Sequence, residues 1–256
     1  MKKIWFLSVL TGLCVLLSGC ASDADELAPS DITLRELEAA MNRATDPQGA
    51  FAGSQSYIMR QEIREKQFLD DDIEAMVEVK FMRPDKFALI TYKDNKPSNI
   101  FCTNGKNGWV ADCGSRRIVQ LSEEELHSML RFARLGCPGP GGYSSIFKKV
   151  ELFRCSNRHG EFYRIDCSDE GQSEPVSFYV DKDEFLLRRV KTSASVGKKG
   201  SFDYEAAITA YGWRFGVQIP LEMEIRQLGA KQESKVIYYQ LNPVIPDSDF
   251  LPPVFQ

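Results

Sequence analysis

The sequence predicts one α+β domain in which roughly eleven to thirteen short strands form an antiparallel sheet with two or three helices. Three observations lead to this fold class. Many short segments carry apolar residues at every second position, which is typical of half-buried strands. Turn signals such as Asp94-Asn95 and Asn104-Gly105 separate most of these segments, with no helix between them. Only two longer segments show the period of an amphipathic helix.

The N-terminus has the layout of an export signal that ends at a cysteine. Lys2 and Lys3 precede an apolar run over residues 4–17, and two small residues come before Cys20. This layout is typical of a secretory signal peptide, and the run is shorter than the about 20 residues that span a membrane. An ordinary signal peptide with an incidental cysteine, or an uncleaved anchor, would also fit.

The tetrapeptide LSGC that ends at Cys20 resembles the lipobox of bacterial lipoproteins. This resemblance implies that residues 1–19 are a lipoprotein signal peptide, removed by cleavage, and that the Cys20 thiol is acylated. Residues 20–30 are acidic and polar with little to bury, so we interpret them as the lipidated cysteine and its tether. The remaining chain, residues 31–256, forms the predicted domain.

The amino-acid composition excludes few classes of protein. The chain of 256 residues has 43% hydrophobic and 27% charged residues, which is ordinary for a globular protein. Its net charge of −4 argues against nucleic acid as a partner, because nucleic-acid binding needs clustered positive charge. A mildly acidic net charge can also be explained by solubility alone, without any binding partner.

Seven cysteines are present, of which Cys14 lies in the signal peptide and Cys20 is the expected acylation site. An exported chain can form disulfides. We therefore expect one or two structural disulfides, with the pairing left open, among the other five: Cys102, Cys113, Cys137, Cys155 and Cys167.

The first helix is predicted just after the tether. Thr33 and Glu36 form a capping-box pattern, and the helix should end before Asp46-Pro47. One face of this helix is apolar: Leu34, Leu37, Ala40, Met41 and Ala44.

From residue 55 the apolar period changes to two. Val77, Val79, Phe81 and Arg83 share one side of a strand, with Glu78 on the other. Further strands are predicted at KFALITY, NIFCT, GWVAD, RIVQL, VELFRCS, EFYRIDC, PVSFYV, EFLLRRVKT, FDYEAAITAYG, QIPLEMEIRQ and SKVIYYQL.

A second helix interrupts the strands. Ser122 and Glu125 form another capping box, and Gly136 marks the end. Its apolar face consists of Leu126, Met129, Leu130 and Ala133. A short helical segment is expected near residues 144–149, and the closing segment NPVIPDSDFLPP is too rich in proline for a helix or a central strand.

A sheet of more than about ten strands must curl or split. Two helices cover only part of its apolar face, which favours an enclosed space, although a conventional filled core fits the pattern equally well.

Catalytic motifs are missing from the sequence. The two histidines have no motif around them, and no nucleophile elbow, zinc motif or phosphate loop is present. Asp70, Asp71 and Asp72 lack the ligand spacing of a calcium loop and read as a solvated turn. We therefore expect a protein that is not an enzyme and has no cofactor or metal.

Four segments, in order, resemble the periplasmic lipoprotein-sorting proteins of the LolA/LolB-like family. They are FMRPDKFAL, TNGKNGWVAD, FYVDKDEFLLRRVKT and LNPVIPDSDFLPP, which together extend over residues 75–253. The resemblance implies a curled antiparallel half-barrel of about eleven strands, lidded by two or three helices and enclosing an apolar cavity for acyl chains.

The resemblance also assigns a functional site. Arg83 matches the family's functional arginine, which points into the cavity and couples the lid to lipid binding. A charged residue on an apolar face needs polar partners, although an arginine at a strand end can also extend to water. The candidate cavity residues are Arg83, Val77, Val79, Phe81, Phe87, Leu89, Trp109, Leu126, Met129 and Leu130.

The predicted function is therefore a lipid-anchored envelope protein that binds acyl chains, chiefly of lipoproteins, for transfer or receipt. The soluble carrier of the family has no anchor and its outer-membrane receptor has one, so Cys20 favours a receptor-like role. Ala21 and Ser22 are not the aspartate that retains lipoproteins at the inner membrane, which favours the outer membrane. Expected partners are lipids, the anchoring membrane and a soluble carrier protein. The alternative is an envelope sensor or scaffold that binds a protein partner.

Overall fold

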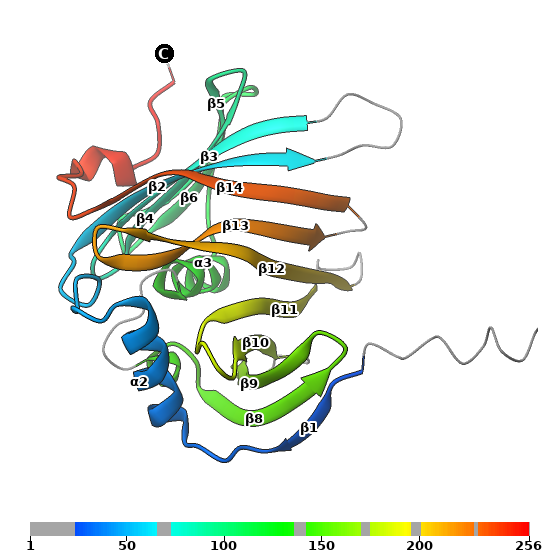
Figure 1. Cartoon of the computed structure of the whole chain (residues 1–256). Helices are drawn as coiled ribbons and strands as arrows, with labels where there is room; N and C mark the ends of the chain where they lie inside the picture. Colours follow the sequence, from blue (N-terminus) through cyan, green and yellow to red (C-terminus); the bar gives the residue numbers. More distant parts are fainter. Residues whose placement is uncertain are drawn as a thin grey trace, which may run out of the picture.

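The computed structural model describes residues 24–65, 73–135, 142–169, 175–195, 201–227 and 230–255. Its fourteen described strands form one sheet in which each neighbouring pair is antiparallel. The strand order is β1-β8-β9-β10-β11-β12-β13-β14-β2-β3-β4-β5-β6-β7, so the two edges are β1 and β7. Figure 1 shows that the sheet curls, so that β8–β11 lie opposite β2–β6.

The bounds of the strands are β1 Glu26–Pro29, β2 Ser56–Glu65, β3 Ile73–Met82, β4 Lys86–Lys93, β5 Lys96–Thr103, β6 Gly108–Asp112, β7 Arg117–Gln120, β8 Lys149–Asn157, β9 Gly160–Ser168, β10 Val176–Asp181, β11 Leu187–Ser195, β12 Ser201–Arg214, β13 Val217–Gln227 and β14 Ala230–Leu241. The helices are α2 Leu34–Thr45 and α3 Glu123–Leu135, with short 3-10 helices η1 Tyr143–Ser145 and η3 Asp247–Phe250.

The curled antiparallel sheet with two α-helices fits the predicted half-barrel, although it has fourteen strands where about eleven were expected. Both capping boxes are present. Thr33 and Glu36 bond reciprocally at the start of α2, and Ser122 and Glu125 do the same before α3. The segment near 144–149 forms only η1 before β8 begins.

The predicted tether is partly folded. Residues 20–23 lie outside the described residues, but 26–29 form the edge strand β1, which pairs with β8. This strand has no apolar alternation and is exposed throughout, so no periodic pattern marks it in the sequence.

The two faces of the sheet differ in chemistry. On the inner face, one buried cluster comprises Tyr57, Val77, Val79, Phe81, Phe87, Val217, Ile219, Val236 and Tyr239. A second comprises Leu37, Phe147, Tyr163, Ile165, Cys167, Phe178 and Val180. Leu37 belongs to α2, so the apolar face predicted for this helix packs on the β8–β11 half of the sheet.

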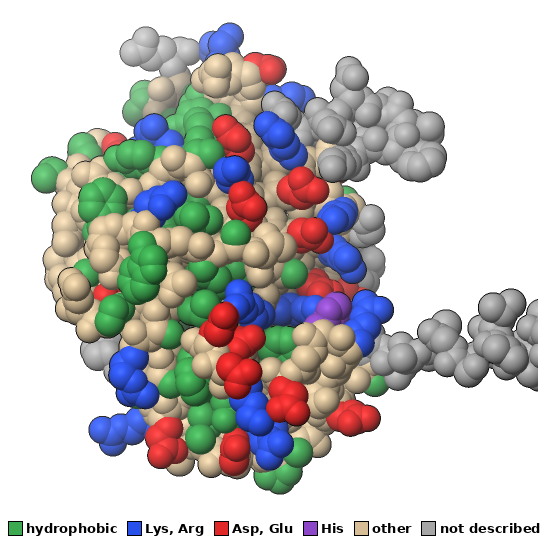
Figure 2. Space-filling model, viewed as in Figure 1, with side chains coloured by type: hydrophobic (Ala, Val, Ile, Leu, Met, Phe, Trp, Pro, Cys, Tyr) green, Lys and Arg blue, Asp and Glu red, His purple; other side chains and the backbone are tan. Residues whose placement is uncertain are grey.

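The outer face is charged across its central strands. Cross-strand pairs such as Lys231–Glu224, at 3.1 Å, and Lys235–Glu222, at 3.2 Å, join β13 and β14. Figure 2 shows acidic and basic side chains side by side over this region. Such exposed pairs contribute little stability each, but they keep this face in water and so distinguish it from the inner face.

The C-terminal segment covers the outer face over β3–β6. Phe250 is fully buried and packs with Ile245, Ala88 and Cys102. Beside this cluster the Lys80 ammonium bonds Asp249 at 2.8 Å and lies 3.2 Å from Glu78. A proline-rich segment therefore closes part of the core without regular secondary structure beyond η3.

The expected disulfides are absent among the four cysteines that the structure describes. Cys102, Cys113, Cys155 and Cys167 are free, and Cys137 lies outside the described residues. Three of them pack in different clusters, so their sulfur atoms cannot meet. Burial raises the pKa of Cys102 to about 11, and burial with the nearby Asp25 carboxylate raises that of Cys155 to about 12. Both therefore remain protonated thiols at neutral pH.

Asp25 fixes the N-terminal end of the described chain to the sheet. Its carboxylate accepts hydrogen bonds from Tyr179 Oη at 2.5 Å, Arg164 at 2.8 Å and Asn157 Nδ2 at 2.8 Å. Burial by itself raises the pKa of Asp25, but these hydrogen bonds and the nearby cations outweigh it and leave the pKa below its ordinary value.

We expect this group to make stability depend on acid pH. Because the folded pKa is lowered, the stabilising contribution is complete above the ordinary value of 3.8 and disappears as pH falls through the folded value. Thermal unfolding from about pH 7 to about pH 3 should show this loss, and Asp25→Asn should flatten it. Asp94→Asn, at an exposed turn, is the control. Identical acid profiles for Asp25→Asn and the natural chain would contradict the assignment.

Candidate functional site

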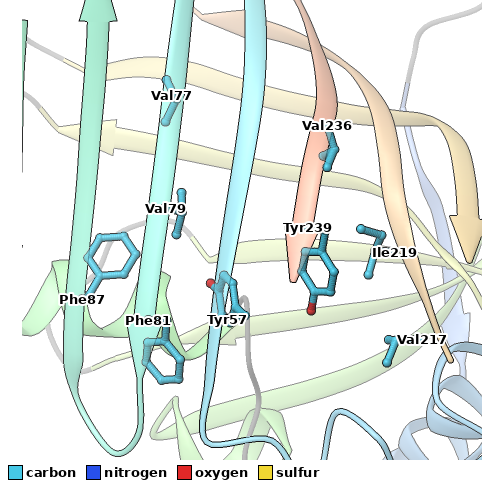
Figure 3. Close-up of a cluster of buried hydrophobic side chains, with 9 residues drawn as sticks. All are labelled: Tyr57, Val77, Val79, Phe81, Phe87, Val217, Ile219, Val236 and Tyr239. Carbon is cyan, nitrogen blue, oxygen red and sulfur yellow. The ribbon is translucent and has the colours of Figure 1, made fainter. Parts of the chain in front are cut away.

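Five of the predicted cavity residues lie together on the inner face. Val77, Val79, Phe81 and Phe87 are buried in one cluster, and Leu89 packs against it. Antiparallel register explains this, because Phe81 lies opposite Phe87 and Val79 lies opposite Leu89. Figure 3 shows that the four buried side chains point to the same side as those from β2, β13 and β14.

Aromatic rings form the centre of this cluster. The Tyr57 ring lies 5.6 Å from the Phe81 ring and 6.1 Å from the Tyr239 ring. Phe51, from the segment between α2 and β2, extends the row at 6.5 Å from Tyr57. This end of the inner face is therefore a packed apolar wall.

The apolar inner face continues beyond both clusters. Towards the β7 edge, Leu89, Phe101, Val110 and Val119 lie opposite one another in register, and Phe101 and Val119 are exposed.

In the centre of the sheet, Ser234 is buried, and its hydroxyl has no hydrogen-bond partner among the described residues. An unmade hydrogen bond in an apolar wall costs about 1–3 kcal/mol.

Arg83 lies at the turn between β3 and β4 and is half-buried. Its Nε donates to the carbonyl oxygen of Ser54 at 2.9 Å, in the segment that leads into β2. The expectation that Arg83 meets a polar partner is therefore confirmed, and a backbone carbonyl is one such partner.

The same turn contacts two other segments. Asp85 accepts from Arg134 of α3, with Oδ1 at 2.9 Å from Nε and 2.7 Å from the terminal nitrogen. Lys86 bonds Asp247 of η3 at 2.7 Å. Within four residues the turn thus joins the start of β2, the end of α3 and the C-terminal segment.

A second ion pair holds α3 on the other half of the sheet. Arg131 lies 2.7 Å from the Asp169 carboxylate, just after β9. The Arg131 guanidinium also lies 5.5 Å from the centre of the Phe147 ring, which belongs to the second inner cluster. These contacts place α3 on the inner side of the sheet, and Figure 1 shows it behind β12 and β13.

The apolar residues predicted on this helix are Leu126, Met129 and Leu130. Leu126 and Leu130 lie on α3 and are half-buried. Met129 also lies on α3, but its side chain is outside the described part of the structure. The described contacts of the helix side chains include the two ion pairs and the contact of Arg131 with the Phe147 ring.

Trp109 does not lie with the other predicted cavity residues. Trp109 lies opposite Cys102 on β5, Cys102 lies opposite Ala88 on β4, and Ala88 lies opposite Lys80 on β3. Residues opposite one another point to the same face, which here is the outer face. The Trp109 side chain therefore packs with the C-terminal segment. The following residue, Val110, is the one on the inner face. A shift of one residue in a strand moves a side chain to the opposite face.

A surface hollow lies at the turns between β8 and β9 and between β10 and β11. It has a volume of about 530 Å³ and is lined largely by charged residues, including His159, Glu161, Lys182 and Arg188. Lys182 pairs with Glu161 at 2.9 Å, and Arg188 lies 3.9 Å from Asp181. This polar hollow does not offer the apolar lining that an acyl chain needs.

Sequence reasoning missed the four residues that attach α3: Asp85, Arg131, Arg134 and Asp169. The available signal was a pair of arginines three positions apart on a helix predicted from its apolar face. Cys20, the predicted lipid-attachment residue, lies outside the described residues. Among the described residues, no helix is long and apolar enough to cross a bilayer.

The fold and the inner face together define a curled antiparallel sheet with helices on its apolar side. No protein-family model matches the sequence, and no curated protein matches it. Solved structures with the same fold are known.

A LolA superfamily protein from Nitrosomonas europaea matches with a TM-score of 0.55 at 11% identity, covering 86% of this chain and 98% of that one. A domain from Vibrio parahaemolyticus assigned to outer membrane lipoprotein sorting matches with a TM-score of 0.54 at 12% identity. The match covers 84% of this chain and 94% of that one. A DUF1329 family protein from Desulfovibrio piger matches with a TM-score of 0.54 at 11% identity. The match covers 84% of this chain and 97% of that one. The resemblance inferred from the four sequence segments is therefore confirmed at the level of fold.

The ionic attachment of α3 predicts a specific local change. Arg134→Ala removes both bonds to Asp85, whose side chain is partly exposed, so we expect about 1 kcal/mol less protection of α3 and little change in global stability. Amide hydrogen exchange in α3 should then be about fivefold faster. Arg117→Ala, on the exposed edge strand β7, is the control. Unchanged exchange in Arg134→Ala would show that the ion pair does not hold the helix.

Proposed function

We propose that this chain is a lipid-anchored protein on the periplasmic side of the cell envelope that binds acyl chains between the inner face of its sheet and α3. The acyl chains are those of lipoproteins in the first place, bound for transfer or receipt at the outer membrane. The LolA superfamily fold and the outer-membrane sorting assignment of one neighbour support this class of ligand.

The observation that carries the proposal is the way α3 is attached to an apolar wall. The helix is held at the inner face by the Arg134–Asp85 and Arg131–Asp169 ion pairs. The Arg134–Asp85 pair is partly exposed and the Arg131–Asp169 pair is largely buried. In both pairs the hydration that the charges regain on opening offsets the lost attraction, whereas opening a packed apolar core is costly. A cover attached in this way can move while the sheet stays folded.

The energetics of an acyl chain require such a cover. Exposing a sixteen-carbon chain to water costs roughly 12 kcal/mol, at about 0.8 kcal/mol per methylene. A site that held the chain much more tightly than a membrane would never release it. In this proposal Val77, Val79, Phe81, Phe87 and Leu89 form part of the wall, and Leu126, Met129 and Leu130 belong to the cover.

Arg83 has a positioning role in this proposal. Its bond to the Ser54 carbonyl fixes one side of the β3–β4 turn, while Asp85, two residues away, bonds α3. A change at the helix is therefore transmitted to the turn and to the start of β2.

The direct test is mass spectrometry of the protein after gentle purification, followed by binding of a fluorescent fatty acid. We expect a co-purifying acyl lipid and saturable probe binding. A folded chain with neither would instead favour the sensor or scaffold alternative.

Acylation at Cys20 gives a second prediction. Cys20→Ser should abolish incorporation of labelled fatty acid and release the protein from the membrane fraction or leave unprocessed precursor. Cys14→Ser, within the predicted signal peptide, should change neither. If label still enters Cys20→Ser, the anchor is elsewhere or absent.

Arg83→Leu separates a functional from a purely structural arginine. The change leaves the buried Ser54 carbonyl without this donor, so stability should fall by about 1–3 kcal/mol while the chain stays folded. Transfer of an acylated peptide to acceptor vesicles should fall far more than stability does, and Arg83→Lys, which keeps the cation, should restore part of it. Transfer that follows stability in both variants would leave Arg83 with a structural role only.

A further inference from the structure

One polar side chain in the apolar wall has no hydrogen-bond partner. Ser234 on β14 is 3% exposed, and its hydroxyl bonds no atom of the described residues. A buried hydroxyl without a partner is unfavourable, and folded proteins rarely keep one unless water or a ligand satisfies it. The hydroxyl therefore marks a place where a further hydrogen-bonding group can bind.

The strand register places Ser234 on the inner face. It lies opposite Ile63 of β2, which packs against the buried cluster. Val236, two residues further along β14, belongs to that cluster. Figure 3 shows Val77 and Val236 at one end of the cluster, and their strands continue beyond it. Ser234 thus lies just past the packed end of the wall, on the face that binds the acyl chain in the proposed function.

Two neighbours of Ser234 can respond to a ligand. Gln61 lies diagonally across from it on β2, a spacing of about 7–8 Å that long side chains can bridge. Met223 lies opposite it on β13, and methionine changes rotamer readily. Both neighbours are half-buried. Among the described residues the Gln61 amide donates to the Met59 sulfur alone, at 3.7 Å, and a thioether is a weak acceptor. Gln61 can therefore donate to a ligand together with Ser234.

A carboxylate lies on the same face, nearer the end of the strands. Glu65 is opposite Gln232 and accepts a hydrogen bond from its Nε2 at 2.7 Å. Glu65 is two residues from Ile63, so it is the other diagonal neighbour of Ser234. A negative charge this close repels a second carboxylate. A neutral group that accepts hydrogen bonds therefore matches the site best.

We propose that Ser234 and Gln61 bind the carbonyl oxygen of an ester- or amide-linked acyl group, whose hydrocarbon chain runs from there along the apolar wall. A carbonyl oxygen has two lone pairs and accepts from both the hydroxyl and the amide N–H. It carries no charge, so Glu65 does not repel it as it repels a free fatty acid. The site therefore selects acyl chains that are attached to a carrier molecule. This inference rests on the acyl binding of the proposed function and names the chemical form of its ligand.

Three fluorescent probes of equal chain length test this selection on the full chain: a fatty acid, its methyl ester and the corresponding alkane. Ser234→Ala should weaken binding of the ester about fivefold, which corresponds to one neutral hydrogen bond. Binding of the alkane should stay unchanged. Because the same substitution removes a buried hydroxyl without a partner, the Tm of the unliganded chain should rise by about 2 °C.

Ser177→Ala is the matched control. Ser177 is 5% exposed, but its hydroxyl bonds Asp166 at 2.7 Å. It faces away from the wall, because its neighbour Phe178 belongs to the second inner cluster. This change should lower the Tm and leave binding of the ester and the alkane unchanged. Ser234→Thr keeps the hydroxyl and should keep the response to the ester.

Glu65→Gln tests the exclusion of free fatty acids. Removing the charge should raise the affinity for the fatty acid about fivefold and leave the affinity for the ester unchanged. Glu62→Gln, on the exposed outer side of the same strand, should change neither affinity.

The outcomes separate this inference from the proposed function. If Ser234→Ala leaves ester binding unchanged, or weakens ester and alkane equally, the proposal is overturned and the hydroxyl is satisfied by an ordered water. If the folded natural chain binds none of the three probes, the acyl binding of the proposed function is wrong, and the carbonyl site is rejected with it.

Discussion

One constraint governs the rest of the structure: a fourteen-stranded antiparallel sheet has an apolar face that must be kept from water. The sheet curls, so that β8–β11 lie opposite β2–β6, and α3 contacts both halves. The outer face carries charged side chains in cross-strand ion pairs, and its apolar part over β3–β6 is covered by the C-terminal segment.

The helices close this face in two different ways. α2 is packed into it through Leu37, which is fully buried in the β8–β11 cluster. α3 is instead tied at Asp85 and Asp169, in the two halves of the sheet. Charges that form an ion pair regain hydration when the pair opens, so a helix held by ion pairs can separate from the sheet at smaller cost than one held by apolar packing. The proposed acyl-binding function relies on this difference.

The β3–β4 turn shows how a short polar sequence can coordinate distant segments. Arg83, Asp85 and Lys86 bond the start of β2, the end of α3 and the C-terminal segment in turn. This arrangement stabilises the fold.

Elements with local signals could be predicted from the residues alone. Both capping boxes, the apolar face of α2 and the inner position of Val77, Val79 and Phe81 follow from hydrogen bonds or periods within a few residues. Features that depend on long-range pairing became clear only in the folded chain. β1 became a strand because β8 offers a free edge. Trp109 faces outward because its register with Cys102 fixes its side of the sheet. The ion pairs of α3 join residues far apart in the chain, and no local pattern specifies such contacts.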